Sequence, residues 1–364
     1  WGTEMNHKSV LMTLVILLPA AASGAEIVNK DGNKLDLYGQ LNGVHYFSSD
    51  ANNNGDRSYT RFGFKGETQI GNALTGYGQW EYQAGLDQPE SAGPGDSYTR
   101  LGFAGLTFGH WGSLDYGRNY GLLYDVAGWT DVLPEFGNDS YEAADNFMTG
   151  RANGLLTYHN RSLGGLVDGL DLGLQYQGKN RGDDAQRAKD IQTQNGDGYA
   201  FSATYDTGVG LNVGAAYANS ARTLAQQRFG LADGDRARAW TLGLKYDQDN
   251  LYLAASYART ENMTYVDGDR YAGFAPRADA VEAVAQYHFD SGVTPSLAYL
   301  QTRGRNLPGI GDADLVKYLD LALNYSFNAN MSTYVEYKLN LLQRQNAVGA
   351  GADDIVETGI MYQF

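Results

Sequence analysis

The sequence contains no cysteine, and this absence excludes several kinds of site. The chain can form neither disulfide bonds nor thiolate metal sites, and it has no cysteine nucleophile. Histidine is scarce as well, and none of the five residues stands in a G-x-S-x-G or H-E-x-x-H motif. A hydrolytic enzyme needs a positioned nucleophile and base, which no motif here supplies. We therefore expect no enzyme, no cofactor and no resident metal.

Positive charge is also in short supply. Lys and Arg number 27 against 42 Asp and Glu, which gives a formal net charge of -15. A chain with this balance cannot neutralise a row of phosphates. We therefore exclude nucleic acid as a partner.

Long apolar runs are almost absent, and the single one lies near the N-terminus. Residues 10–18 form an apolar stretch preceded by Lys8 and followed by small residues up to Gly24. The run is too short to cross a bilayer and is typical of a secretory signal peptide. We expect residues 1–24 to be upstream residues and signal peptide, with the true start at Met5 and cleavage before Ala25, and residues 25–364 to form the mature domain.

Glycine and tyrosine are abundant, with 47 and 27 residues, while proline is rare, with 7. This composition favours strands and tight turns. Apolar and polar residues alternate after residue 33: in LDLALNYSF (319–327) leucines and aromatic residues fall on one face, and Asp320 and Asn324 on the other. Sixteen segments alternate in this way, beginning near residues 34, 58, 73, 97, 112, 148, 169, 199, 211, 238, 251, 281, 293, 316, 331 and 355.

The joints between these segments alternate in length. Short ones such as GNAL (71–74) and DQDN (247–250) are separated by long polar loops such as 178–198 and 219–237. An even number of strands with short turns at one end and long loops at the other predicts an all-β, sixteen-stranded antiparallel transmembrane barrel with short periplasmic turns, long extracellular loops and a water-filled lumen. A soluble β-sandwich is the alternative. Aromatic residues at strand ends, such as Tyr205 and Tyr287, favour a membrane interface instead.

Three arginines are expected on one interior wall. SYTRFGFKGE (58–67) and SYTRLGFAGL (97–106) begin two strands that run in the same direction, so Arg61 and Arg100 fall at similar height on the polar face. They are two strand spacings apart, about 10 Å before tilt. Arg151 begins the next strand of that direction.

An acidic segment lies beside this wall. Residues 119–147 hold six acids, among them Asp131, Glu135 and Asp139, and no Lys or Arg. The same segment contains Trp129 and Phe136, which prefer contact to water. We expect the segment to fold into the lumen, where its apolar side chains pack on the wall and its acids face the arginines across water.

Several motifs resemble one family. LYGQLNG, YTRFGFKGE, GYGQWEY, SLDYGRNYG, DVLPEFG and the terminal MYQF are similar to the enterobacterial general diffusion porins of the osmoporin (OmpC/OmpF) type, and the resemblance spans 25–364. It implies a homotrimer of barrels in the Gram-negative outer membrane. It also implies that the third loop, about 118–147, folds inside each barrel as a constriction.

By matching motifs, the resemblance places Asp131 and Glu135 on the acidic side of the constriction and Arg61, Arg100 and Arg151 on the basic side. It implies a contact between subunits through Glu90 and Arg118. This chain has Gln40 where relatives often carry a pore lysine, and Tyr98 before the second TR. Having fewer cations favours a weak preference for cations. Further residues are expected to line the pore: Gln40, Tyr59, Glu81, Tyr98, Tyr120, Tyr124 and Asp139.

The function implied is passive diffusion of ions and small hydrophilic solutes, including nutrients and antibiotics. The resemblance implies contact with outer-membrane lipid and lipopolysaccharide, assembly by the barrel-assembly machinery through Phe364, and use as a receptor by phages or toxins. A substrate-specific sugar channel is the closest alternative, and saturable block by one sugar would favour it. The repeated DGDR (233–236 and 267–270) lacks a full calcium-binding loop, so we interpret it as solvated loop tips.

Overall fold

The computed structural model describes residues 24–92, 97–180, 190–229, 232 and 234–364. Residues 1–23 of the expected signal peptide therefore lie outside the described residues. The strands are β1 (Ala25–Lys30), β2 (Asn33–Ser48), β3 (Gly55–Asp56), β4 (Tyr59–Gly71), β5 (Leu74–Gly85), β6 (Tyr98–Thr107), β7 (Ser113–Tyr120), β8 (Arg151–Asn160), β9 (Leu170–Gln177), β10 (Gly198–Asp206), β11 (Leu211–Ala221), β12 (Arg236–Gln248), β13 (Leu251–Glu261), β14 (Tyr265–Asp267), β15 (Ala272–Phe274), β16 (Arg277–Tyr287), β17 (Val293–Leu307), β18 (Gly311–Ser326), β19 (Met331–Asn340) and β20 (Ile355–Gln363). The helices are η1 (Ala51–Asn53), η2 (Glu90–Ala92), η3 (Gly109–Trp111), α1 (Tyr124–Ala127), α2 (Ser162–Gly165) and α3 (Leu224–Arg228).

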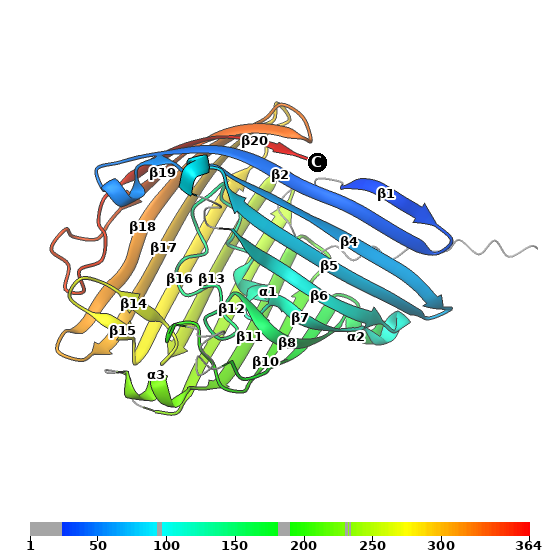
Figure 1. Ribbon diagram of the computed structural model, residues 1–364, viewed down its shortest axis with the longest axis horizontal. Coiled ribbons are helices and arrows are strands. Elements are labelled where there is room, and N and C mark those ends of the chain that lie inside the picture. Colours follow the sequence, from blue (N-terminus) through cyan, green and yellow to red (C-terminus); the bar gives the residue numbers. More distant parts are fainter. Residues whose placement is uncertain (1–23, 93–96, 181–189, 230–231, 233) are drawn as a thin grey trace, which may run out of the picture.

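The strands of the described chain close into a barrel, as Figure 1 shows. One sheet holds 18 of them, in which β1 and β3 are short additions beside β2, and sixteen long antiparallel strands form the ring. The hairpin of β14 and β15 stands apart in a loop. No helix in the described ranges is long and apolar enough to cross a membrane.

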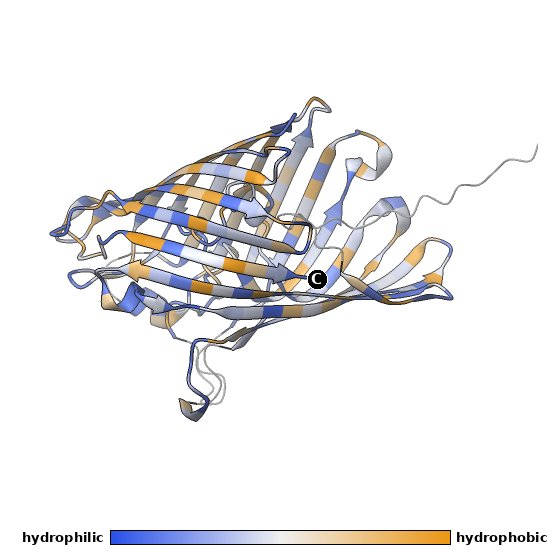
Figure 2. Ribbon diagram, turned by 90° about the horizontal axis from the view of Figure 1, so that it is seen from above, coloured by the Kyte–Doolittle hydropathy of each residue, from blue (hydrophilic) through white to orange (hydrophobic). Residues whose placement is uncertain are grey.

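The apolar face of the strands points outward. On β18, Leu321 and Leu323 are each 48% exposed, whereas the alternating residues Asp320 and Ala322 are buried. Figure 2 shows the resulting alternation of hydrophobic and hydrophilic residues along the strands. In a soluble sandwich these leucines would face the interior, so the sandwich alternative is wrong. Lipid is the environment that accepts such a surface.

Most strands begin within two residues of the positions expected from hydropathy, and three do not. β16 begins at Arg277 instead of 281, and β18 at Gly311 instead of 316. Backbone pairing continues there through charged, outward-facing residues such as Asp279, beyond the point where the apolar alternation ends. β8 begins later, at Arg151, because residues 147–150 are buried as part of the loop that precedes it. The short strands β1, β3, β14 and β15 were not expected.

The first and last strands of the described chain, β1 and β20, lie along one edge of β2. The first half of β2 pairs with β1, and its second half pairs with β20. Between these two ladders, Gly39 and Phe364 exchange two backbone hydrogen bonds of 3.0 Å. The last residue of the chain therefore takes part in closing the ring.

The loop between β7 and β8, residues 121–150, folds inside the barrel and carries α1 (Figure 1). Its apolar side chains form the centre of the main hydrophobic core, together with small inward residues of the wall. Gly214 on β11 and Gly243 on β12 are paired. A Cβ atom on Gly214 would lie 2.6 Å from Trp129, and a Cβ atom on Gly243 would lie 2.5 Å from Val126. The two glycines make room for the loop. The expected inward folding of the acidic segment is present.

Candidate functional site: a charged constriction

The tip of the inner loop is held on the wall by hydrogen bonds to its backbone. The buried carboxylate of Glu336, on β19, accepts from the backbone N–H groups of Glu135 at 2.9 Å and Phe136 at 3.2 Å. The Tyr318 hydroxyl, on β18, accepts from the N–H of Gly137 and donates to Asp139 at 2.8 Å. Lys338 completes this end with an ion pair to Asp139 of 2.9 Å.

This anchoring leaves two acids of the loop directed at tyrosines and arginines. Glu135 accepts from the hydroxyls of Tyr59 at 3.1 Å and Tyr46 at 3.4 Å. Burial raises the pKa of Glu135, and the charge of Arg61 opposes that rise. Burial likewise raises the pKa of Asp131, against the hydrogen bond from Tyr124 and the charges of the arginines.

Arg61 on β4 and Arg100 on β6 lie together on the inner wall. Both donate to Oε1 of Gln83, at 2.7 and 3.4 Å. Arg61 also lies over the ring of Tyr59, 4.6 Å from its centroid. Arg100 sits at a break in strand register, since Glu81 pairs with Leu101 and Tyr82 with Thr99. A bulge of this kind re-aims a side chain, and here it brings Arg100 onto Glu81 at 2.5 Å.

Arg151 is connected to the acidic side through two aromatic rings. Its guanidinium lies 5.7 Å from the centroid of Tyr120, which stacks on Tyr124 at 4.2 Å. The Tyr124 hydroxyl donates to Asp131 at 2.5 Å. Arg151 and Asp131 therefore lie at the two ends of one series of side-chain contacts inside the barrel.

Residues 30–364 match the family model described as Gram-negative porin. The chain belongs to this family. The porin is 54% identical to outer membrane protein F of Serratia marcescens, over 99% of this chain and 100% of the relative. It is 51% identical to outer membrane porin N of Escherichia coli, with the same coverage. The structure described as Salmonella typhi OmpF in complex with daunomycin is 46% identical, with a TM-score of 0.85 over 93% of this chain and 100% of that one.

These relatives settle the class of function. The porin is a general outer-membrane porin of the OmpC/OmpF type, a multi-pass barrel in that membrane, and not an enzyme. Because this family consists of general porins, the alternative of a sugar-specific channel is wrong. In the part of the chain that the structure describes, no group of three or more His, Asp or Glu side chains could hold a metal ion.

The structure brings most of the expected pore residues together. Tyr59, Glu81, Tyr120 and Tyr124 contact the charged groups as described, and Gln40 lies 3.5 Å from the Tyr59 hydroxyl. Asp139 is engaged by the wall, through Tyr318 and Lys338, so its charge is already compensated.

Glu90 and Arg118, which are expected to meet between subunits, lie apart from each other within one chain. Glu90 is exposed in η2, whereas Arg118 donates to Asp145 at 2.6 Å and to Asn153 at 2.8 Å. Arg118 borders a groove of about 470 Å³, which is lined by Tyr98, Thr99, Arg118, Ala144, Asp145, Arg151 and Asn153.

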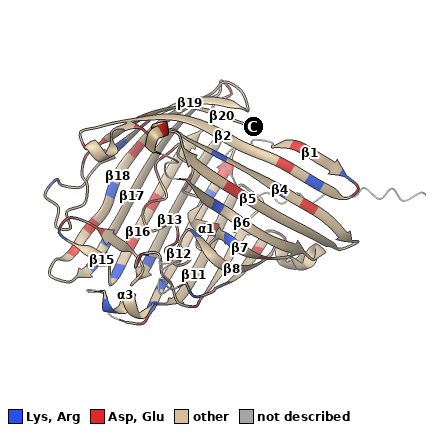
Figure 3. Cartoon of the chain, viewed as in Figure 1, with Lys and Arg blue, Asp and Glu red and all other residues tan. Residues whose placement is uncertain are grey.

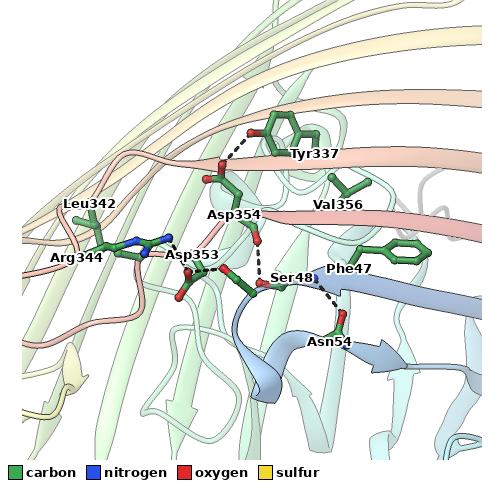
Figure 4. A pocket seen from close by; sticks show the side chains of 11 residues that line it. Phe47, Ser48, Asn54, Tyr337, Leu342, Arg344, Asp353, Asp354 and Val356 are labelled. Atoms are coloured by element: carbon green, nitrogen blue, oxygen red, sulfur yellow. Dashed lines mark hydrogen bonds and ion pairs between the residues drawn. The ribbon is translucent and has the colours of Figure 1, made fainter.

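A second groove, of about 750 Å³, lies at the loop end of the barrel, away from the constriction (Figure 4). Asp354 accepts from Tyr337 at 2.8 Å, and Asp353 accepts from Ser49 at 2.7 Å and pairs with Arg344 at 3.5 Å. These bonds join the first and last loops of the chain. We interpret the groove as the seam between those loops.

The wall groups that hold the inner loop were missed from the sequence. Glu336, Tyr318, Lys338 and Glu282 stand at inward positions of their strands. Inward polar residues were interpreted as lining water. The sequence did contain one signal for these anchors: several of the later strands carry acids at inward positions, although the loop inside the barrel is itself acidic.

Proposed function

We propose that this porin passes ions and small hydrophilic solutes down their gradients through a pore whose narrowest part lies between two sets of charges. Asp131 and Glu135 form the acidic side, and Arg61, Arg100 and Arg151 form the basic side. The observation that carries this proposal is the inner loop, held on the wall by Glu336 so that Asp131 and Glu135 face the arginines.

Opposed charges create a field across the path of a solute. Two unit charges ~4 Å apart interact by ~1 kcal/mol in bulk water and ~4 kcal/mol at an effective dielectric of 20. Such a field orients water and polar solutes, and it disfavours apolar ones, which lose hydration without compensation. Selection among ions stays mild because a wide pore lets them keep most of their water and because salt screens the charges.

A weak preference for cations follows from the balance of charges. Arg100 is paired with Glu81, and the pore has Gln40 where a further cation could stand. The net charge of -15 acts in the same direction. The solved OmpF relative is a complex with daunomycin. We extend this to the present porin by proposing that drug-sized polar solutes also enter its lumen.

The zero-current potential across a planar bilayer in a KCl gradient tests the proposal. The wild-type porin should show the sign of cation preference, and Asp131→Asn and Glu135→Gln should each reduce it. Asp290→Asn, in an exposed turn, is the matched control and should have little effect. An anion-selective wild-type channel would contradict the charge assignment.

We propose a homotrimer in which Glu90 of the partner subunit reaches the groove beside Arg118. The groove is open, and Arg118 already presents one face to Asp145. Replacing Glu90 by Gln should lower the temperature at which the trimer dissociates on a gel, whereas Glu67→Gln, an exposed acid at the other end of the barrel, should not. Equal stability of the two variants would count against the contact.

We propose that lipopolysaccharide contacts a band of outward-facing charges at the loop ends of β13 and β16 to β18. Arg259 and Arg305 both pair with Asp279, at 2.7 and 2.9 Å, on the same face of β16 as the lipid-facing Val281. Figure 3 shows blue and red residues side by side at this end of the barrel. Arginine suits phosphate recognition. Reduced lipopolysaccharide retention by Arg259→Gln and Arg305→Gln porin, relative to Arg57→Gln between β3 and β4, would support this contact.

We also propose that residues 1–24 are removed and that the barrel-assembly machinery engages the chain through Phe364. β1 begins at Ala25, which is the first residue after the expected cleavage site. Phe364 is fixed by its backbone bonds to Gly39. Mass measurement of the mature protein tests the cleavage site. A Phe364→Ala variant that assembles at the wild-type rate would argue against the terminal signal.

A further inference from the structure

Two buried acids lie close to Ser140, where the inner loop returns to the barrel wall (residues 140–150, the returning arm). Glu142 comes from the loop, after the tip, and Glu282 points inward from β16. The exposed fractions are 7% for Glu142 and 1% for Glu282. The Ser140 hydroxyl donates to Glu142 at 3.5 Å, and Ser140 also interacts with Glu282. The Ser140 carbonyl accepts from Thr302 at 2.5 Å.

Each carboxyl group uses one oxygen and leaves the other without a partner. Oε2 of Glu282 accepts from the Thr130 hydroxyl at 2.5 Å. Oε2 of Glu142 accepts from the Tyr141 N–H at 3.3 Å and from the Ser140 hydroxyl at 3.5 Å. Oε1 of each is buried and has no hydrogen-bond partner among the described residues. A buried oxygen that lacks a donor is costly, unless a proton placed between the two groups supplies one.

The surroundings add no positive charge to compensate two carboxylates. Neither acid forms an ion pair within the described part of the chain, and the nearby cation Lys338 is bound to Asp139. The ionisable groups that face the pair are otherwise acids and phenols. They are Asp131, Asp139 and Tyr141 on the loop, and Tyr318 on β18.

Two neighbouring carboxyl groups in a buried site cannot both ionise readily, so the pair titrates as a unit. We propose that Glu142 and Glu282 share one proton, and that this hydrogen bond between a carboxyl and a carboxylate positions the returning arm of the constriction loop against β16. The inference rests on the proposed role of the loop as the constriction. It adds a positioning pair on the side of the loop away from the tip anchor Glu336.

The sign of the pH dependence follows from the proton. Burial, and after it the charge of Glu282, raise the pKa of Glu142 well above its usual range. An acid whose pKa is raised by folding contributes stability that is present at low pH and is lost as the pH rises through the folded value. Alkaline pH should therefore release the returning arm, because the second ionisation places two like charges side by side.

Infrared difference spectroscopy of the refolded porin in detergent tests the shared proton directly. At neutral pH, the wild type should show a C=O stretching band of a protonated carboxylic acid that is absent from both Glu142→Gln and Glu282→Gln. Comparing spectra with each variant isolates this pair from the other buried acids. A spectrum in which neither substitution removes such a band overturns the pair.

Single-channel recording from neutral to alkaline pH tests the positioning. Wild-type current fluctuations should increase as the pH rises, and the part of this response that Glu142→Gln removes should equal the part that Glu282→Gln removes. The double variant should lose no more of this pH response than either single variant loses, because both substitutions act on the same proton. Glu261→Gln, in an exposed ion pair with Arg238, is the matched control and should keep the wild-type profile.

The two hypotheses fail differently. Additive losses in the double variant, or variants that keep the wild-type pH profile, overturn the positioning pair while leaving the selectivity of Asp131→Asn channels unaffected. If Asp131→Asn and Glu135→Gln leave the zero-current potential unchanged, the proposed constriction fails whatever the infrared result. Trimer migration on unheated gels confirms that each variant has folded before it is measured.

Discussion

Nε of Arg100 lies 2.5 Å from a carboxylate oxygen of Glu81, so the middle arginine of the inner wall carries its own counter-ion. Both side chains are nearly buried, and such a pair presents little net charge to the pore. In the proposed constriction, the basic side should therefore act mainly through Arg61 and Arg151.

Removing the counter-ion should expose the charge of Arg100. We expect Glu81→Gln to lower the ratio of cation to anion permeability by about twofold to fivefold, because one unit charge in water acts with ~1 kcal/mol at ~4 Å. The zero-current potential in a KCl gradient measures this ratio. Glu67→Gln removes an exposed acid from the same sheet and should leave the ratio unchanged; an equal shift in both variants would show that overall charge decides.

Acid should weaken the cation preference earlier than it titrates exposed carboxylates. Burial raises the pKa values of Asp131 and Glu135 above the ordinary 3.8 and 4.5. Their negative charge is therefore lost as the pH falls through values higher than these. We expect permeability ratios recorded across this pH range to fall in the wild type. They should stay nearly flat in the double variant Asp131→Asn with Glu135→Gln, and a double variant that follows the wild-type curve would place the titrating groups elsewhere.

The tip of the constriction loop should depend on one wall carboxylate. Glu336→Leu leaves two backbone N–H groups without an acceptor, at a cost of about 1–3 kcal/mol each. We expect larger and noisier single-channel conductance, and faster protease cleavage within residues 131–139. Glu336→Gln keeps an acceptor oxygen and should stay close to the wild type. Unchanged conductance in the Leu variant would mean that other contacts hold the tip.

A charge on the lipid face should cost more than one on the lumen face of the same strand. Arg or Lys at the bilayer midplane of a barrel costs about 2–4 kcal/mol. We expect Leu321→Arg, at an exposed outward position of β18, to reduce the free energy of unfolding from lipid vesicles by about 2–4 kcal/mol. Asn324→Arg, on the inward face, should cost far less. Urea titrations of both variants in vesicles compare the two faces.

The barrel itself could be predicted from the sequence because its cause is local. Lipid outside and polar contacts inside impose a period of two on every strand, as at Leu321 and Asp320, so strand number and facing follow from one chain. The ends of strands were less predictable where Asp279 and Arg277 continue the backbone ladder after the apolar pattern stops. Hydrogen bonding, not hydropathy, sets those ends.

The constriction remains a proposal, and its residues came from two kinds of signal. Shared strand register predicted Arg61, Arg100 and Arg151 on one wall, whereas the choice of Asp131 and Glu135 within the acidic loop came from the family resemblance. The bulge at Arg100 depends on the register between β5 and β6, which no single strand encodes. For Glu336 and Glu282, the period of two shows that they face inward. It does not show that the loop covers them, so their role as anchors required the three-dimensional structure.

The exchange of hydrogen bonds between Gly39 and Phe364 lies at the seam of the ring. β2 precedes every other long strand of the ring in the sequence, and β20 follows them all. A barrel without β20 keeps one edge of β2 open, and an open edge is poorly tolerated in hydrocarbon. Loss of β20 alone would therefore expose unpaired backbone groups to lipid, although the rest of the ring is intact.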